Sequence, residues 1–217
     1  FQPPGGKPVP MPINAGVYVL EPEVFSFIPP HKKVSIEHDV FPKLAKEKGL
    51  FHYPISGIWK DVGKPEELLE GNLLLLRYLI ENAGEATKNL IQDSVKVQGS
   101  VKIHSPVMIG ENVVIKPGCE IGPDVLIGND VYIGENVKIK NSLIQDEVYI
   151  SDGVKMDNSI ISTNCQLDES VVLEGNQHNL VILASHVRVQ PGLRLRASEK
   201  VNLGVCHHET VKENRSF

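Results

Sequence analysis

Residues 109–139 read IGENVVIKPGCEIGPDVLIGNDVYIGENVKI, and an isoleucine stands at every sixth position. Extended towards the N-terminus, the same spacing gives nine β-branched aliphatic residues: Ile91, Val97, Ile103, Ile109, Ile115, Ile121, Ile127, Ile133 and Ile139. A second apolar residue follows each of them by four positions, from Val95 to Leu143. Because the two positions differ by an even number, both side chains can point to one side of a short extended segment.

Residue types that favour turns stand between the two apolar positions. Three residues after the aliphatic position come Asn112, Gly118, Asp124, Asp130, Asn136, Gly153 and Asn164, which tolerate left-handed backbone conformations. Each hexad is therefore a short strand followed by a bend, and three of them close a triangular coil of about eighteen residues. Successive coils stack about 4.8 Å apart. The pattern predicts a mostly β protein with a parallel β-helix, with roughly four to five coils in residues 91–173.

The period shifts by one residue at two Asn-Ser pairs, Asn141-Ser142 and Asn158-Ser159, which predicts two tightened corners. After an insertion at residues 175–179 the repeat returns weakly at Leu183, Val189 and Leu195. We therefore expect the β-helix at residues 85–200 and a tail at residues 201–217. The alternative, a β-sandwich, needs longer strands and real loops. The motif resembles the hexapeptide-repeat family, and that resemblance implies a left-handed coil.

The overall composition limits the classes of function. A formal charge of −5 argues against a nucleic acid or anionic membrane held by a general basic field. Three widely spaced cysteines without a CxxC pair are typical of a reduced cytoplasmic protein rather than a disulfide scaffold. The sequence contains no run of eighteen apolar residues, and therefore it predicts no membrane-spanning helix. A start at Phe1 within a Pro/Gly-rich stretch leads us to expect a piece of a longer protein.

Residues 1–84 show an incomplete α/β pattern. We expect strands at 13–20 and 51–58, a short helix from Glu23 to about Ile28, and a second helix capped by Ser35. A third helix is expected from Glu66 to about Asn82, apolar on most sides and packed between the two domains.

Three segments of this region carry a resemblance: INAGVYVL at 13–20, SIE at 35–37 followed by VFPKL at 40–44, and WKDVGKPE at 59–66. They resemble the second half of the sugar-1-phosphate nucleotidyltransferases, and the Ser-Ile-Glu segment is most similar to mannose-1-phosphate guanylyltransferases. The resemblance covers about residues 13–82. It implies nucleotidyl transfer from GTP to mannose 1-phosphate with release of pyrophosphate, and a requirement for Mg²⁺. A uridylyl- or thymidylyltransferase acting on glucose 1-phosphate is the nearest alternative.

The same resemblance implies roles for four residues. Asp61 is the catalytic residue and one of two aspartates that hold Mg²⁺, a cation that prefers hard carboxylate oxygens. Asn14 and Gly16 line the sugar pocket, and Lys7 is the residue that could stand in for a substrate-binding lysine. The family's Gly-rich triphosphate loop and its second aspartate are missing from these 217 residues. We therefore expect the chain alone to be inactive.

Two further functions stay open. Many hexapeptide-repeat proteins are acyltransferases with a histidine base, for which His104, His178 and His186 are candidates. A non-catalytic regulatory subunit would keep the nucleotidyltransferase fold without activity. In each case we expect a homo-oligomer formed through the β-helix, whose open ends need a cap or a partner. For Asp61 and Asn14, the alternative to a binding role is hydrogen bonding to the local backbone.

Overall fold

The computed structural model describes residues 13–84 and 87–216, and the chain divides after Trp59 into two compact units. The predicted division lay later, after residue 84. The difference arises because the loop that carries Asp61 and the long helix α2 (Pro65–Asn82) belong to the same unit as the β-helix.

The second unit is a parallel β-helix of seven coils with three faces. The first face holds β1 (Leu90–Ile91), β4 (Val107–Ile109), β7 (Val125–Ile127), β9 (Lys138–Ile144), β11 (Lys155–Ile161), β14 (Val181–Leu183) and β17 (Leu203–Val205). The second face holds β2 (Lys96–Val97), β5 (Val114–Ile115), β8 (Tyr132–Ile133), β10 (Tyr149–Ile150), β12 (Gln166–Leu167), β15 (Arg188–Val189) and β18 (Thr210–Val211). The third face holds β3 (Lys102–Ile103), β6 (Glu120–Ile121), β13 (Val172–Glu174), β16 (Arg194–Arg196) and β19 (Arg215–Ser216). Strands β9 and β11 run through a corner and contribute to the first and third faces.

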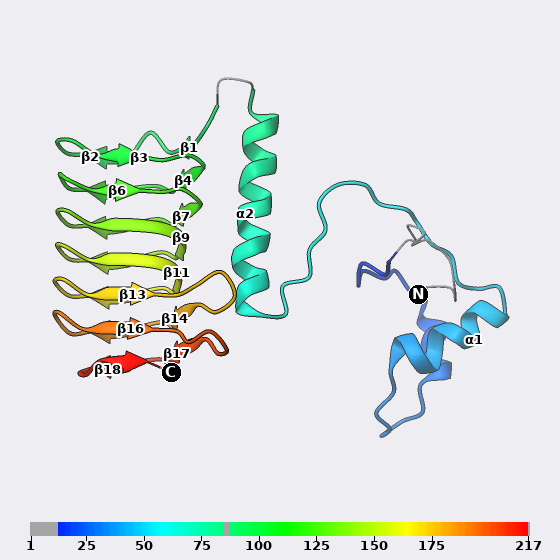
Figure 1. Ribbon diagram of the computed structural model, residues 1–217. Coiled ribbons are helices and arrows are strands. Elements are labelled where there is room, and N and C mark those ends of the chain that lie inside the picture. Colours follow the sequence, from blue (N-terminus) through cyan, green and yellow to red (C-terminus); the bar gives the residue numbers. More distant parts are fainter. Residues whose placement is uncertain (1–12, 85–86, 217) are drawn as a thin grey trace, which may run out of the picture. The chain divides into compact units, whose positions relative to one another are not determined.

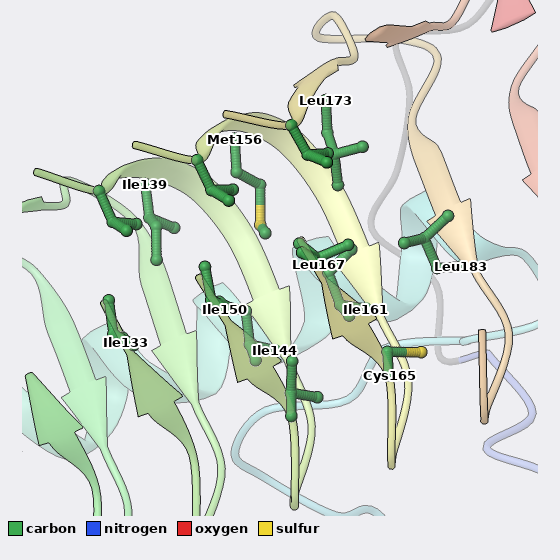
Figure 2. Close-up of a cluster of buried hydrophobic side chains, with 14 of the residues drawn as sticks. Ile133, Ile139, Ile144, Ile150, Met156, Ile161, Cys165, Leu167, Leu173 and Leu183 are labelled. Carbon is green, nitrogen blue, oxygen red and sulfur yellow. The ribbon is translucent and has the colours of Figure 1, made fainter. Parts of the chain in front are cut away.

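The predicted interior column is confirmed from Ile109 onward, whereas Ile91 and Val97 in the first coil are 41% and 47% exposed. The side chains of Ile109, Ile115 and Ile121 are fully buried, and Figure 2 shows the equivalent residues of later coils stacked inside the helix, from Ile133 to Leu173. The seven predicted bend residues all have positive φ, between 55° and 79°. Because Asn, Asp and Gly tolerate this conformation, the chain can turn after each short strand.

The register of the strands explains both the slips and the insertion. Tyr132 pairs with Tyr149 where an unshifted repeat would place a partner one residue later. These coils are one residue shorter, and the shortening lies at the corners Asn141 and Asn158, which both have a φ of 48°. The insertion at 175–179 then lengthens the next coil. Residues 203–216, predicted as a tail, form β17, β18 and β19 and make a seventh coil; another loop, at residues 198–202, had disrupted the repeat.

Helix α2 lies along the first face of the β-helix (Figure 1). One outward apolar residue per coil forms its docking surface: Leu90, Met108, Leu126, Leu143, Ile160 and Ile182. Leu69 and Leu76 of α2 are buried against this column. On the rest of the helix, Leu75 and Tyr78 are 46% and 44% exposed. The predicted packing of the helix is thus confirmed for the side that contacts the β-helix.

Two polar contacts fix the position of α2 along the stack. Arg77 Nη2 lies 2.5 Å from Asp124 Oδ1 at a corner of the third coil. Near the start of α2, the side-chain amide of Asn202 donates a hydrogen bond to Glu66, and this bond lowers the pKa of the Glu66 carboxyl below its usual value. The contacts join α2 to the third and the seventh coils of the stack.

We expect the attachment of α2 to weaken on acidification. A carboxyl whose pKa is lowered by folding stabilises the folded state fully above its ordinary pKa, near 4.5, and this contribution is lost as the pH falls through the folded-state value. In Glu66→Gln the contribution should be absent at every pH. The unfolding free energies of the two proteins should therefore differ at pH 7 and converge once the pH has fallen through the lowered folded-state pKa of Glu66. Urea denaturation across this range measures it, with Glu81→Gln at the exposed end of α2 as the control; a constant difference would contradict the assignment.

The first unit contains η1 (Pro22–Phe27), a π-turn η2 (Ile36–Val40) and α1 (Phe41–Lys46). Ser35 Oγ accepts a hydrogen bond from the His38 amide, which confirms the predicted cap. Neither predicted strand forms: residues 13–20 and 51–58 lie without strand partners, and Val19 and Phe51 are 99% and 87% exposed. A strand needs a neighbour for its backbone hydrogen bonds, and none is present in the described part of this unit.

Among the helices described, none combines the length and apolarity that crossing a membrane requires.

Candidate functional site

Asn14 is the centre of a hydrogen-bonded cluster in the first unit. Its side-chain amide nitrogen lies 2.6 Å from the Tyr18 hydroxyl and 3.0 Å from Glu37 Oε1, and the Tyr18 hydroxyl donates to the same Glu37 oxygen over 2.7 Å. The Gly16 amide donates to Asn14 Oδ1 over 2.9 Å. The structure thus brings the predicted residues Asn14 and Gly16 together and adds Tyr18 and Glu37.

The local fold of residues 14–18 depends on Gly16. Its φ of +75° is a conformation that side chains rarely adopt, and no heavy atom lies within 4 Å of where a Cβ would stand. Open space beside this turn fits the expectation that Gly16 leaves room for a ligand. The Trp59 indole nitrogen donates to the Ala15 carbonyl over 3.2 Å and so anchors the turn.

The aromatic ring of Tyr18 meets the ring of Phe41 edge-on, with centroids 4.8 Å apart. The Glu37 carboxylate accepts the hydrogen bond of the Tyr18 hydroxyl and raises the pKa of Tyr18 above its ordinary value. Tyr18 therefore stays a neutral hydrogen-bonding group, and Glu37 keeps an exposed carboxylate beside Asn14. Such groups can bind the hydroxyls of a polar ligand.

Asp61 lies in the second unit, on the loop that leads into α2. The loop is fastened to the helix on both sides of Asp61: Lys60 Nζ lies 2.7 Å from Glu70, and the Lys64 amide donates to Glu67 Oε2 over 3.0 Å. Asp61 itself is exposed. Residues 62–65 line an open pocket of about 270 Å³, which is bordered on its other side by Gln145, Ile160, Ser162 and Ile182 of the β-helix.

The residues fit a magnesium ion only in part. No group of three His, Cys, Asp or Glu side chains that could hold a metal occurs in residues 13–84 and 87–216. Mg²⁺ is commonly bound by one or two carboxylates together with waters and phosphate oxygens. The single exposed carboxylate of Asp61 therefore suits one ligand position of such an ion. The fourth predicted residue, Lys7, lies outside the described residues.

Comparison with known proteins gives the family. Residues 103–216 match the model described as the GMPPB C-terminal domain, which is more than half of the chain. The chain belongs to this family. Residues 4–77 match the model described as Nucleotidyl transferase, a range that includes Lys7, Asn14, Gly16 and Asp61.

Curated relatives of this GMPPB C-terminal domain protein match over about a third of its length. The "Mannose-1-phosphate guanyltransferase 2" of Candida glabrata is 48% identical over 67 residues, which are 31% of this chain and 18% of that protein. The "Probable mannose-1-phosphate guanylyltransferase 3" of Arabidopsis thaliana is 41% identical over 69 residues, 32% of this chain and 20% of that protein. The chain thus spans about one-fifth of the length of the curated relatives it matches.

Among solved structures, the acetyltransferase domain of PglB from Neisseria gonorrhoeae covers 64% of this chain and 62% of its own, at 16% identity and a TM-score of 0.33.

Within the GMPPB C-terminal domain, the other candidate residues lie apart from Asp61 in sequence. His178 is in the exposed loop of the insertion, where its amide donates to Asn176 Oδ1 over 3.0 Å. His186 stands at a corner and stacks on His208 of the next coil, with ring centroids 4.6 Å apart. Cys119 and Cys165 are buried core residues, and burial raises the pKa of both thiols.

A shallow groove of about 470 Å³ lies on the third face. Two of its lysines are paired: Lys138 lies 3.4 Å from Glu120, and Lys140 lies 2.9 Å from Asp157. The groove is also lined by Lys155, so its lining holds three lysines and two carboxylates.

Proposed function

We propose that this chain is the sugar-binding and Asp61-bearing part of an enzyme that transfers a guanylyl group from GTP to mannose 1-phosphate and releases pyrophosphate. One observation carries the proposal: the range that matches the nucleotidyl transferase family contains every predicted site residue. The curated relatives that match about a third of the chain, at 41–48% identity, are named as guanyltransferases. The chain covers only about one-fifth of the length of those relatives. The activity, substrates and partners of the whole protein are therefore part of this proposal.

The cluster around Asn14 supports a sugar site. Asn14, Tyr18 and Glu37 provide amide, hydroxyl and carboxylate groups within 3.0 Å of one another, a chemistry that matches the hydroxyls of a hexose. The exposed backbone at Gly16 allows close approach of a ring. Lys7 would supply a positive charge to the sugar phosphate.

Asp61 would hold one position of a Mg²⁺ ion, which when bound neutralises charge on the phosphates. In phosphoryl-type transfers the protein acts mainly by positioning and by charge stabilisation. The role of this chain is then to hold the sugar hydroxyls at Asn14 and Glu37 and to present the Asp61 carboxylate on a fixed loop.

The 217 residues alone are expected to release no pyrophosphate. In the first unit Val17, Val19, Phe51 and Tyr53 are more than 80% exposed, although such side chains in extended segments normally pack in a sheet. This exposure supports a partner sheet supplied by further α/β structure. In our proposal that structure also carries the triphosphate loop and the second aspartate.

The deciding experiment is pyrophosphate release by the full-length protein with four nucleoside triphosphates and several sugar 1-phosphates. GTP with mannose 1-phosphate should be the best pair. Preference for UTP or dTTP with glucose 1-phosphate would replace the proposed substrates. Binding of GDP-mannose without turnover would indicate a regulatory subunit, and acetyl-CoA turnover lost in His178→Ala or His186→Ala would indicate an acyltransferase.

Asn14→Ala in the full-length protein should raise the KM for the sugar 1-phosphate by about tenfold, because one polar contact contributes roughly 1–1.5 kcal/mol. Steady-state pyrophosphate release at saturating GTP measures it. Asn82→Ala, at the end of α2, is the matched control and should leave this KM unchanged. An unchanged KM in Asn14→Ala would remove Asn14 from the sugar site.

We also propose that the protein is a cytoplasmic homo-oligomer assembled through the β-helix. Helix α2 covers the first face, whereas the second face exposes Tyr149, which stacks on Tyr132 with ring centroids 4.8 Å apart. The three unpaired cysteines suit a reducing compartment. Light scattering on the 217-residue chain tests the assembly; a monomer at every soluble concentration would contradict it.

A further inference from the structure

Gly71 stands in the interior of α2, six residues after its start at Pro65, where glycine is unfavourable compared with alanine. A Cβ at this position would lie 3.2 Å from Val62 Cγ1 and 3.4 Å from Lys60 Cγ. These two residues flank Asp61. The absence of a side chain at Gly71 therefore lets the loop of residues 60–64 lie directly on the helix.

Polar contacts also hold the loop of residues 60–64 against α2 beside Gly71. Glu70, next to Gly71, pairs with Lys60, and Glu67, one turn earlier, accepts the Lys64 amide. A Cβ on Gly63 would lie 3.6 Å from Glu67 Oε2 and 3.8 Å from Asp61 Oδ1. The residues on both sides of Asp61 are thus attached to the same face of α2.

Helix α2 is itself attached to the β-helix. Leu69 and Leu76 are buried against the first face, Arg77 pairs with Asp124, and Glu66 accepts a hydrogen bond from Asn202 in the seventh coil. A continuous set of contacts therefore runs from the coils through α2 to the loop that carries Asp61. All of these residues lie within the second unit.

We propose that Gly71 is a positioning residue, through which the β-helix sets the place of Asp61. The effect of Gly71 on catalysis rests on the proposed function. The packing of the loop of residues 60–64 against α2 does not depend on that function. A rigid loop matters because a displacement of about 1 Å in a positioned group can cost about 100-fold in rate. A larger side chain at residue 71 pushes Val62 and Lys60 off the helix and moves the carboxylate between them.

The first test uses the 217-residue chain and needs no activity. Gly71→Leu introduces a good helix former and should loosen only the loop, so hydrogen exchange of the Lys64 amide, which is bonded to Glu67, should accelerate about tenfold when measured by NMR. Exchange in the coils should not change. Glu81→Leu, an exposed site at the other end of α2, is the matched control and should leave the loop as in the wild type.

The second test uses the full-length enzyme. In Gly71→Leu the Mg²⁺ concentration that gives half-maximal pyrophosphate release should rise about tenfold, with a smaller rise in Gly71→Ala and an unchanged KM for the sugar 1-phosphate. Wild-type loop exchange and wild-type Mg²⁺ dependence in Gly71→Leu would overturn the proposal. If the wild-type enzyme releases no pyrophosphate with any substrate pair, the proposed function fails. The hydrogen-exchange result still decides whether Gly71 holds the loop of residues 60–64 on α2.

Discussion

Asp61→Asn in the full-length protein is expected to lower pyrophosphate release from GTP and mannose 1-phosphate by on the order of 10²–10³-fold. The amide keeps the size of the side chain but removes the charge that holds a hard cation. Loss of a metal ligand weakens a charge stabilisation of several kcal/mol, and each 1.36 kcal/mol is about a factor of ten in rate. The loop should keep its structure, because its fastening contacts come from Lys60, Lys64, Glu67 and Glu70 rather than from Asp61.

The matched control is Asp93→Asn, which removes an equal charge from an exposed position outside the proposed site and should retain wild-type activity. Thermal unfolding of Asp61→Asn should match the wild type. Raised Mg²⁺ should restore part of the lost rate if the ion is bound more weakly. Full activity of Asp61→Asn would remove its carboxylate from the proposed metal site.

The β-helix could be predicted in detail because its information is local. Each hexad specifies its own strand, bend and inward residue, so Ile109, Ile115 and Ile121 were placed by spacing alone and are buried. The docking of α2 was only partly foreseen. The sequence pattern for this docking repeats once per coil rather than once per hexad. On the first face, the residue before the inward position is apolar, as at Met108, Leu126 and Leu143.

The first unit was harder to predict because its structure depends on contacts distant in sequence. The expected strands at 13–20 and 51–58 had the right composition, but a strand forms only beside a partner. The contact of Asn14 with Glu37 joins residues 23 positions apart, and no spacing rule gives it. Glu37 is part of the Ser-Ile-Glu segment that carries the family resemblance. Its hydrogen bond with Asn14, however, can be identified only from the folded structure.

Ile139→Ala should destabilise the β-helix by about 2–5 kcal/mol, the range for truncation of a fully buried aliphatic side chain. Ile139 is 1% exposed, and its strand pairs with those of Ile121 and Met156 in the coils on either side. Urea denaturation followed by circular dichroism measures the change. Lys138→Ala is the control on the same strand: its side chain points outward and forms a surface ion pair with Glu120, so the expected cost is about 0–1 kcal/mol.

The same truncation at the end of the stack separates a continuous core from a set of independent coils. Ile91 belongs to the first coil and is 41% exposed, so Ile91→Ala should cost less than about 1–2 kcal/mol because little apolar area is lost. In a stacked repeat each coil is stabilised by its neighbours, and the cost of truncation should therefore rise from the first coil towards Ile139. Equal costs at Ile91 and Ile139 would show that the coils do not share one interior column.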